Sequence, residues 1–426
     1  MQDNFTRFDM TKPPVRQANY LRPLIWALTI PEVTLRGSKI IKTEMEGIKP
    51  PYLLLCNHNA FYDFKVATKA IFPHRANYII AIDGFIGREW LLRQVGGICK
   101  RKFTNDIQLI RHIRQVFKNG DILILYAEAR YSLCGTTAVL PDSLGKLCRS
   151  MGVPVVSLIC HGHHLQSPFW NLRKRKVRGM TAEMKLLFTP EQLKKTPVEE
   201  INRTIREAYR YDDFAWQKEH QIRITEPFRA EDLHKVLYQC PACGKEYRMA
   251  SKGTRIFCEA CGKEWEMTEL GELKAVKAGK ADSPSENGGI VTEFSHIPDW
   301  YEWQRANVRK EVEEGTYSFE GPCHVNSLPN AKRYIPLGQG TLTHNMDGFY
   351  VRGSGKYGPY EMKISAKELY SCHIEYHYLG KYGDCVDLNT LTDTFYTYPE
   401  GNDFSVTKMA LATEELFYYY HPDKIR

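Results

Sequence analysis

The sequence predicts an α/β protein whose first half folds into a mostly parallel sheet flanked by helices. Short apolar runs typical of strands alternate there with helical repeats of apolar residues. Two closely spaced cysteine pairs follow, and beyond them the chain changes to short strand-like segments closed by one helical segment. We therefore predict four parts: an α/β domain at residues 1–230, a zinc ribbon at 236–270, a linker at 271–297 and a β-rich C-terminal domain at 298–426.

The composition is that of a globular protein with more than one domain. The chain has 426 residues, of which 43% are hydrophobic and 25% are charged, and this length suggests two or three domains. No stretch approaches the roughly 20 apolar residues that span a bilayer, and residues 1–17 are too polar for a signal peptide. We therefore expect a cytoplasmic chain, in keeping with twelve cysteines of which eight are scattered. The net charge of +8 permits an anionic partner such as phospholipid but does not identify one.

Residues 19–35 are expected to form an apolar helix that contains Trp26 and has Arg22 and Arg36 near its ends. The segment is too short to span a bilayer. A helix of this kind is suited to the headgroup region, which predicts peripheral attachment to the cytosolic face of a membrane. Packing of the helix on its own domain is the alternative.

Residues 50–63 contain the strongest candidate for catalysis. The apolar run at 52–56 follows two prolines and predicts a buried strand, and the apolar spacing of residues 61–71 predicts a helix. His58 therefore lies at a junction of strand and helix, where open α/β sheets bind their ligands. Asp63 comes after four intervening residues, where its carboxylate can orient the imidazole. We predict that His58 and Asp63 form a general base pair aimed at a hydroxyl group.

The following elements repeatedly place polar residues just past the ends of strands. Residues 96–102 form a predicted glycine-rich turn that ends in three cations. Because the carboxyl ends of parallel strands meet at one edge of a sheet, a single shared site explains this pattern. The predicted strands are residues 77–81, 121–126 and 152–160, and the predicted helical segments are 89–95, 107–117, 144–151 and 190–210.

Four of these segments carry recognisable motifs. An Asn-His-x4-Asp pattern is formed by Asn57, His58 and Asp63, and a Gly-Gly-Ile turn at residues 96–98 leads to a basic cluster. Residues 126–132 and a Val-Pro-Val strand at 153–155 follow. In this order the segments resemble the glycerolipid acyltransferase family, which includes bacterial glycerol-3-phosphate and lysophosphatidate acyltransferases. The resemblance covers about residues 20–225.

Two motifs depart from the family pattern. By strict spacing the arginine of the second motif falls on Lys102, with Arg101 beside it, so either cation is a candidate phosphate ligand. In the third motif Glu128 keeps its place, but Arg130 stands one position early. If the turn is not shifted, Arg130 faces away and Tyr131 occupies the place where the family contacts phosphate.

The resemblance implies an O-acyltransferase of the 1-acylglycerol-3-phosphate type, active in phospholipid biosynthesis. It would move an acyl group from acyl-CoA or acyl carrier protein to a glycerol-phosphate acceptor, and convert lysophosphatidate to phosphatidate. The implied residues are the catalytic pair His58 and Asp63, and the substrate-binding residues Gly97, Arg101, Lys102, Glu128 and Arg130. The altered third motif leaves a different membrane alcohol open as acceptor. A catalytically silent scaffold is a further alternative, against which the presence of both His58 and Asp63 argues.

Two CxxC pairs form the strongest local pattern of the chain. They are separated by fourteen residues, and each is followed by Gly-Lys-Glu and an aromatic residue. Four thiolates in this spacing predict a closed, structural Zn²⁺ site, with a redox dithiol as the alternative. Because lysine and glutamate are mixed around the pairs, no nucleic acid partner is expected. The predicted ligands are Cys240, Cys243, Cys258 and Cys261.

Cys160, His161, His163 and His164 suggest a second metal site at first sight. Ligands so crowded rarely close one tetrahedron, so we expect loop histidines at the rim of the catalytic site.

The last part of the chain is predicted to be a β-rich domain. Strands that are closed by one helix are typical of a small pleckstrin-like barrel, which would bind lipid or protein. The predicted elements are a helix at residues 298–314, a hairpin at 339–351, strands at 360–364, 372–379, 385–388 and 394–398, and a helix at 405–420.

Overall fold

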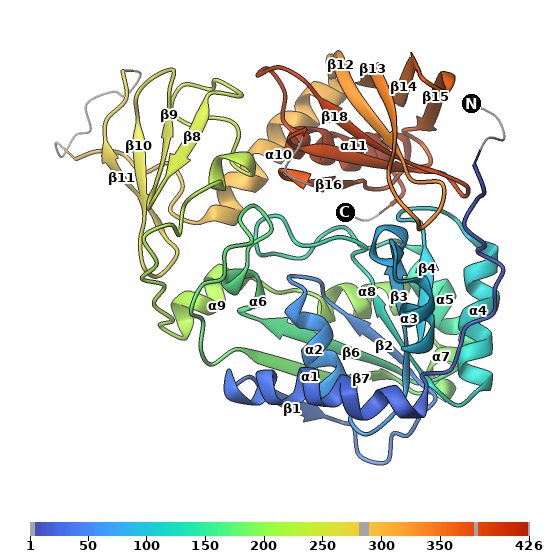
Figure 1. Cartoon of the computed structure of the whole chain (residues 1–426). Helices are drawn as coiled ribbons and strands as arrows, with labels where there is room; N and C mark the ends of the chain where they lie inside the picture. The colour runs from blue at the N-terminus through green and yellow to red at the C-terminus, as the bar shows by residue number, and fades with distance from the viewer. Residues whose placement is uncertain (1–4, 281–288, 379–381, 425–426) are drawn as a thin grey trace.

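The computed structural model describes residues 5–280, 289–378 and 382–424. Its strands form three sheets, which belong to three parts of the chain. In Figure 1 the α/β domain lies at the bottom, a small module that holds the cysteine pairs lies at the upper left, and the C-terminal domain lies at the upper right. We call residues 236–280 the cysteine module and residues 297–424 the C-terminal domain.

The α/β domain is built on a seven-stranded sheet in the order β1-β7-β6-β2-β5-β3-β4. All neighbouring strands are parallel except β6 and β7, which confirms the predicted mostly parallel sheet. The strands are β1 (Lys39–Thr43), β2 (Leu53–Cys56), β3 (Ala76–Ala81), β4 (Gly97–Lys100), β5 (Ile122–Tyr126), β6 (Val155–His161) and β7 (Thr181–Phe188). The predicted turn at residues 96–102 is wrong in part, because four of its residues pair with β3 as strand β4.

Helices cover both faces of this sheet. Leu54 of β2 belongs to the core cluster that includes α1 and α2, whereas its neighbour Leu53 belongs to the cluster that includes α4, α5, α7 and α8. Figure 1 shows α1 and α2 on the near side of the sheet. The helices are α1 (Arg22–Leu35), α2 (Tyr62–Ala70), α3 (Glu89–Gln94), α4 (Ile107–Lys118), α5 (Ser143–Met151), α6 (His163–Gln166), α7 (Pro190–Lys195), α8 (Val198–Ala208) and α9 (Asp213–Glu219). The helical pattern at residues 190–210 is divided at Pro197, which lacks the backbone N–H that would continue α7.

The cysteine module is an antiparallel four-stranded sheet in the order β11-β10-β9-β8. Trp265 of β10 is fully buried, and its ring lies 5.0 Å from that of Trp300 in the following helix, so the module packs firmly on its neighbour. The predicted linker at 271–297 begins with β11, and its residues 281–288 lie outside the described residues. The strands are β8 (Met249–Lys252), β9 (Arg255–Cys258), β10 (Glu264–Met267) and β11 (Leu273–Lys277).

The C-terminal domain consists of a seven-stranded antiparallel sheet, in the order β15-β14-β13-β12-β18-β17-β16, and two helices. The predicted hairpin is confirmed, since β13 and β14 turn between Asn345 and Gly348. The pleckstrin-like barrel stays a prediction. The elements are α10 (Ile297–Glu313), β12 (Ser318–Ser327), β13 (Ile335–Asn345), β14 (Gly348–Gly355), β15 (Gly358–Ser365), β16 (His373–Glu375), β17 (Cys385–Asn389), β18 (Thr394–Pro399) and α11 (Val406–Tyr420).

A buried apolar cluster joins the C-terminal domain to the α/β domain. Phe85 and Cys99 of the α/β domain share it with Leu328, Tyr396 and Tyr398 of the C-terminal domain. The C-terminal domain is therefore packed on the carboxyl-terminal edge of the parallel sheet, the edge at which the predicted catalytic residues lie.

Candidate active site

His58 lies directly after β2, between that strand and α2. Asn57 fixes the end of the strand through two hydrogen bonds of 2.9 Å. Its side-chain amide donates to the carbonyl oxygen of Cys160 and accepts from the N–H of the same residue. Cys160 belongs to the neighbouring strand β6. The backbone at His58 is thus tied to the centre of the sheet, as the strand–helix pattern predicted.

Asp63 lies in the first turn of α2 and gathers four donors around one carboxylate. Its Oδ2 accepts from His58 Nδ1 at 3.2 Å and from the N–H groups of Asn59 at 2.6 Å and Ala60 at 2.9 Å. Its Oδ1 accepts from His163 Nδ1 at 2.6 Å. The carboxylate is therefore held in one orientation, with Oδ2 directed at the imidazole of His58.

The protonation state of this group follows from its partners. Burial alone would raise the pKa of Asp63, but hydrogen bonds from His163 and His58 lower that pKa to about 2. An ionised carboxylate only accepts hydrogen bonds, so Nδ1 of both imidazoles carries a proton. Neutral His58 consequently has its lone pair on Nε2, the atom that a general base needs.

The imidazole of His58 stands between two tyrosines. The ring centroids of Tyr126 and Tyr131 each lie 4.2 Å from that of His58. The side chain of His58 keeps 22% of its surface exposed, so a substrate can reach it.

Glu128 supports the backbone of His58. Its Oε2 accepts from the His58 N–H at 2.6 Å, and its Oε1 accepts from the Ala138 N–H at 2.7 Å and from the Tyr211 hydroxyl at 3.2 Å. The side chain is fully buried, and this burial raises the pKa of Glu128 to about 8. Both oxygens are occupied within the protein, so a direct substrate contact of Glu128 stays a prediction.

Exchanging Glu128 for glutamine is expected to lower the free energy of unfolding by about 1–3 kcal/mol. An amide accepts through one end only, so its NH₂ group would face the N–H of His58 or of Ala138 and leave that donor unsatisfied. Urea unfolding measures the change, with Glu199→Gln on the exposed face of α8 as the matched control. Equal midpoints for the two variants would contradict this role of Glu128.

Residues 32–161 match the family model described as Acyltransferase. They form an acyltransferase domain. The family resemblance drawn from the motifs is thereby confirmed, and His58, Asp63 and Glu128 all lie within the matched segment.

The comparisons with solved structures and with curated proteins add less about the function. The 1-acyl-sn-glycerophosphate (LPA) acyltransferase PlsC from Thermotoga maritima is similar over 45% of this chain and 77% of its own, with 20% identity and a TM-score of 0.34. At that score the likeness carries no information about the substrate of this chain. Comparison with curated proteins finds no match.

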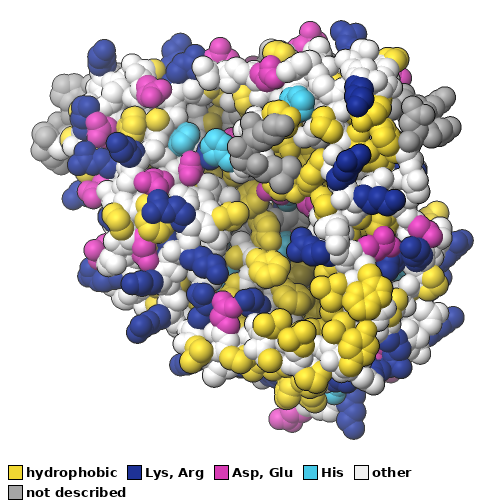
Figure 2. All heavy atoms as spheres, in the orientation of Figure 1, with side chains coloured by type: hydrophobic (Ala, Val, Ile, Leu, Met, Phe, Trp, Pro, Cys, Tyr) yellow, Lys and Arg dark blue, Asp and Glu magenta, His cyan; other side chains and the backbone are white. Residues whose placement is uncertain are grey.

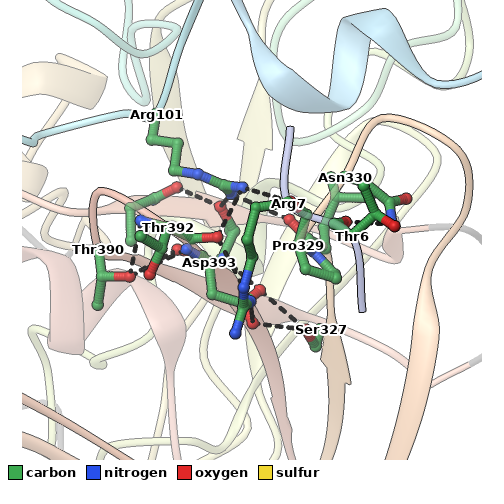
Figure 3. Close-up of polar contacts among 12 residues, drawn as sticks. Thr6, Arg7, Arg101, Ser327, Pro329, Asn330, Thr390, Thr392 and Asp393 are labelled. Atoms are coloured by element: carbon green, nitrogen blue, oxygen red, sulfur yellow. Dashed lines mark hydrogen bonds and ion pairs between the residues drawn. The ribbon is translucent and has the colours of Figure 1, made fainter. Parts of the chain in front are cut away.

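Arg101 follows β4 of the acyltransferase domain and points into the C-terminal domain (Figure 3). Its side chain is almost fully buried. Nη1 donates to the Leu328 carbonyl and to Thr394 Oγ1, at 3.0 and 2.6 Å, and Nη2 donates to the carbonyls of Pro329 and Thr392, at 3.0 and 3.1 Å. These bonds use both terminal nitrogens of the guanidinium.

The other two predicted phosphate ligands also face the C-terminal domain. Lys102 Nζ lies 2.9 Å from Asp387 and 3.6 Å from Asp83, and Arg130 Nη2 donates to Glu414 at 2.6 Å. The structure thus brings the three cations to one domain interface, but each has a protein partner there. Binding of phosphate by Arg101, Lys102 or Arg130 stays a prediction.

Gly97 has a steric reason to be glycine. A Cβ there would lie 2.7 Å from the carbonyl oxygen of Leu92, at the point where α3 meets β4. Its predicted substrate contact is not tested by this packing.

The backbone at the third motif adopts a conformation that glycine, the family's residue there, accepts without strain. Ala129 stands at the glycine position and adopts a positive φ of 55°, which fits a turn that is not shifted. Arg130 points into the C-terminal domain, and the ring of Tyr131 lies against that of His58 at a tilt of 35°. This is the arrangement that the sequence predicts for an unshifted turn.

The histidines after β6 are not loop residues at the rim of the site. His163 and His164 are fully buried in α6, and His163 is hydrogen-bonded to Asp63. That expectation is wrong, because the short helix α6 folds these side chains under the sheet edge. Cys160, Asp63 and His163 are close enough to share an ion, but Asp63 and Nδ1 of His163 are already joined directly by a hydrogen bond of 2.6 Å.

Two sets of contacts in the site carry no signal in the sequence. Tyr211 donates to Asn59 Oδ1 and to Glu128, and His163 donates to Asp63. Both lie between 83 and 152 residues from these partners, so local spacing does not reveal the contacts. The position of Tyr131, by contrast, could be predicted, because the register of the third motif places it where the family contacts phosphate.

The four predicted metal ligands meet in the cysteine module. The Sγ atoms of Cys240 and Cys261, and those of Cys243 and Cys258, lie 3.8 Å apart, and all four fit within 4.8 Å of one another. A tetrahedron with metal–sulfur bonds of about 2.3 Å has edges of about 3.8 Å, so the thiols fit Zn²⁺. The N–H groups of Gly244 and Gly262 close the two cysteine turns onto the carbonyls of Cys240 and Cys258.

Proposed function

We propose that the chain is an O-acyltransferase that moves a fatty acyl group from a thioester to a hydroxyl of a membrane glycerolipid, with His58 as general base. The hydrogen bond from His58 Nδ1 to ionised Asp63 carries this proposal, because it directs the lone pair of Nε2 outward. The match of residues 32–161 to the Acyltransferase family supports it.

In the proposed reaction the acceptor oxygen attacks the thioester carbonyl while Nε2 of His58 takes the hydroxyl proton. Asp63 stabilises the imidazolium that forms. The tetrahedral intermediate then expels the thiolate, which receives the proton from the imidazolium. The products are an ester and a free thiol, and His58 returns to its neutral form.

The state of the nearby thiols supports direct transfer rather than an acyl-enzyme. Cys56 and Cys160 flank the site in sequence, but both are buried. Burial raises the pKa of each thiol well above its ordinary value, so neither is a thiolate nucleophile.

The surface of the molecule supports an acyl donor with an apolar chain. Figure 2 shows a hollow between the lower and upper parts of the molecule, lined largely by hydrophobic side chains. Such a lining suits the acyl chain of acyl-CoA or of acyl carrier protein, the two donors that the family resemblance implies.

The acceptor implied by the resemblance is lysophosphatidate, with phosphatidate as product and a role in phospholipid biosynthesis. Another membrane alcohol is the alternative, and the pairing of all three cations with protein groups favours it. A silent docking scaffold is the remaining alternative, against which the ordered His58–Asp63 pair speaks.

A product assay with the purified chain tests this function. Acyl-CoA or acyl carrier protein is offered with a panel of acceptors that includes lysophosphatidate, glycerol 3-phosphate, monoacylglycerol and lysophosphatidylcholine. Release of free thiol and formation of the acylated product are measured. Absence of turnover with every donor and acceptor would leave the scaffold as the better interpretation.

We also propose that the chain rests on a membrane surface through α1. Among the helices of the described residues, none combines the length and hydropathy needed to cross a bilayer. Leu24, Leu28 and Leu35 of α1 are 54%, 64% and 87% exposed, and Phe61 beside the catalytic loop is 69% exposed. Apolar side chains on a helix near basic residues are suited to the headgroup region. Figure 2 shows hydrophobic side chains on the lower part of the molecule, where α1 lies in Figure 1.

The double variant Leu24→Ser and Leu28→Ser is expected to reduce binding to phospholipid vesicles by at least about tenfold, because each buried leucine contributes about 1.5–3 kcal/mol. Co-sedimentation with vesicles measures binding. The variant Ile290→Ser, also at an exposed apolar residue, is the control. Equal binding of both variants would exclude α1 as the contact.

A structural Zn²⁺ held by Cys240, Cys243, Cys258 and Cys261 is the last part of the proposal. The separation of their Sγ atoms supports it. The closed set of four sulfurs leaves no open coordination position for catalysis, so the ion would stabilise the fold only.

A further inference from the structure

The three cations that the family pattern assigns to phosphate binding are all paired with groups of the C-terminal domain. We propose that Asp387 and Glu414 of the C-terminal domain are specificity-determining residues, which make the enzyme select an acceptor alcohol without a phosphomonoester. This inference rests on the proposed acyl transfer and concerns only which alcohol is acylated.

Arg130 is locked in a neutral network. Its side chain is 3% exposed and that of its partner Glu414 is fully buried. The second oxygen of Glu414 accepts from Arg305 at 2.6 Å, and Ser371 donates to the first oxygen at 2.8 Å. Because both carboxylate oxygens are occupied, Arg130 cannot turn to a substrate without leaving a buried charge unpaired, which costs several kcal/mol.

The surroundings of that network carry no surplus positive charge. Three arginines face three carboxylates within it, and their charges cancel. The members are Arg130, Arg305 and Arg309, and Glu302, Glu414 and Glu415.

Lys102 is outnumbered by carboxylates. Asp387 and Asp83 lie 2.9 and 3.6 Å from its Nζ, and the side chains of Lys102 and Asp387 are 13% and 1% exposed. Burial would lower the pKa of Lys102, but the two carboxylates raise it above its ordinary value. One positive charge thus stands against two negative charges. A phosphomonoester, with a charge of about −1.5 to −2, would be repelled there.

Arg101 is occupied by neutral acceptors, as described above, and its position is fixed by the apolar cluster that joins the two domains. Asp393 of the C-terminal domain lies nearby and is already paired with Arg7 at 2.7 Å (Figure 3). Arg101 therefore keeps its positive charge, but both of its terminal nitrogens are already held by groups of the C-terminal domain.

Tyr131, whose ring lies against the imidazole of His58, is neutral as well. Tyr131 stands at the position of the family's arginine, and its ring lies against His58 with the centroids 4.2 Å apart. Burial raises the pKa of Tyr131, so its hydroxyl remains a phenol. A neutral aromatic wall beside the base suits an acceptor whose reacting hydroxyl is carried by an uncharged headgroup.

Two acceptors that differ only in the phosphate test the inference. Monooleoylglycerol and oleoyl lysophosphatidate are offered in the same mixed micelles with the same acyl donor. We expect kcat/KM of the full chain to be at least about tenfold higher for monooleoylglycerol, because the phosphate finds no cation to replace its water. An equal or higher kcat/KM for lysophosphatidate would overturn the inference but leave the proposed acyl transfer intact. Loss of both reactions, with the rest of the acceptor panel also inactive, would instead overturn the proposed function.

The variant Asp387→Asn tests whether Asp387 causes the preference for an acceptor without phosphate. It keeps the size of the side chain and frees Lys102 from one carboxylate, so the ratio of lysophosphatidate to monooleoylglycerol turnover is expected to rise about tenfold. Asp403→Asn removes a carboxylate that is 77% exposed on the same domain, and should not change the ratio. An unchanged ratio in folded Asp387→Asn would overturn the role of Asp387. If this variant does not fold, the acceptor preference of the unaltered chain still decides the inference.

Discussion

Replacing His58 with alanine is expected to lower kcat of acyl transfer by about 10²- to 10⁴-fold and to leave the fold unchanged. The variant lacks the only atom that the site offers for the acceptor proton in the proposed reaction, Nε2. The imidazole is partly exposed and rests between Tyr126 and Tyr131, so its removal opens no closed cavity. Thiol release measures the rate, and the thermal unfolding midpoint reports on the fold.

His74→Ala is the matched control for this experiment. His74 is exposed and lies between α2 and β3, at the edge of the sheet opposite to His58. We expect its turnover to equal that of the unaltered chain. Full activity of folded His58→Ala would remove the general-base mechanism.

The pH response of the site should not come from Asp63. The pKa of its carboxyl is about 2 in the folded chain, below the ordinary value of 3.8. A lowered pKa of a carboxyl contributes stability that is complete above pH 3.8 and is lost as the pH falls through 2. At any pH above about 4, therefore, Asp63 remains ionised and holds the imidazole.

The pairing of His58 with Asp63 could be predicted because its determinants are local. An apolar strand, a polar junction and a helical repeat lie within residues 50–71, and their order alone places His58 and Asp63 on adjoining turns. The alternation of strands and helices predicts the parallel part of the sheet for the same reason. By contrast, β1 at the edge has three exposed residues at its end and no apolar run, so it gave no strand signal.

The environment of the pair could not be predicted, since it depends on contacts between distant segments. Glu414 meets Arg130 across 284 residues, and Asp387 meets Lys102 across 285. No periodicity or spacing in one sequence records such a pairing. Motif matching therefore selected the three basic residues but not the groups of the C-terminal domain that bind them.

Removal of the proposed Zn²⁺ is expected to have the largest effect on stability. Metal binding contributes about 10–16 kcal/mol in small zinc domains at neutral pH, because their short strands bury too little apolar surface to fold alone. The strands of the cysteine module are four or five residues long. We expect about one tightly bound zinc per chain by elemental analysis, and a chelator should unfold residues 236–280.

The loss of structure after removal of the metal should extend beyond the cysteine module. Trp265 is packed against Trp300 of α10, and Arg305 of the same helix binds Glu414. Unfolding of the module would uncover Trp300 and loosen α10, whose arginines hold the network around Arg130. Chelation is therefore expected to lower the first thermal transition of the whole chain, and hydrogen exchange should show α10 opening together with the module.

Cys258→Ser separates the metal from other effects of cysteine. This variant is expected to lack the zinc and to show the lowered first transition without any chelator, whereas Cys148→Ser, at a fully buried cysteine of α5, should keep one zinc per chain. A redox dithiol would behave differently, because its folded state would contain no metal and would respond to reductant rather than to chelator. A folded Cys258→Ser chain with an unaltered unfolding curve would show that the four thiols meet without a metal. The 3.8 Å spacing of their sulfurs, which matches the edge of a zinc–thiolate tetrahedron, argues for the opposite result.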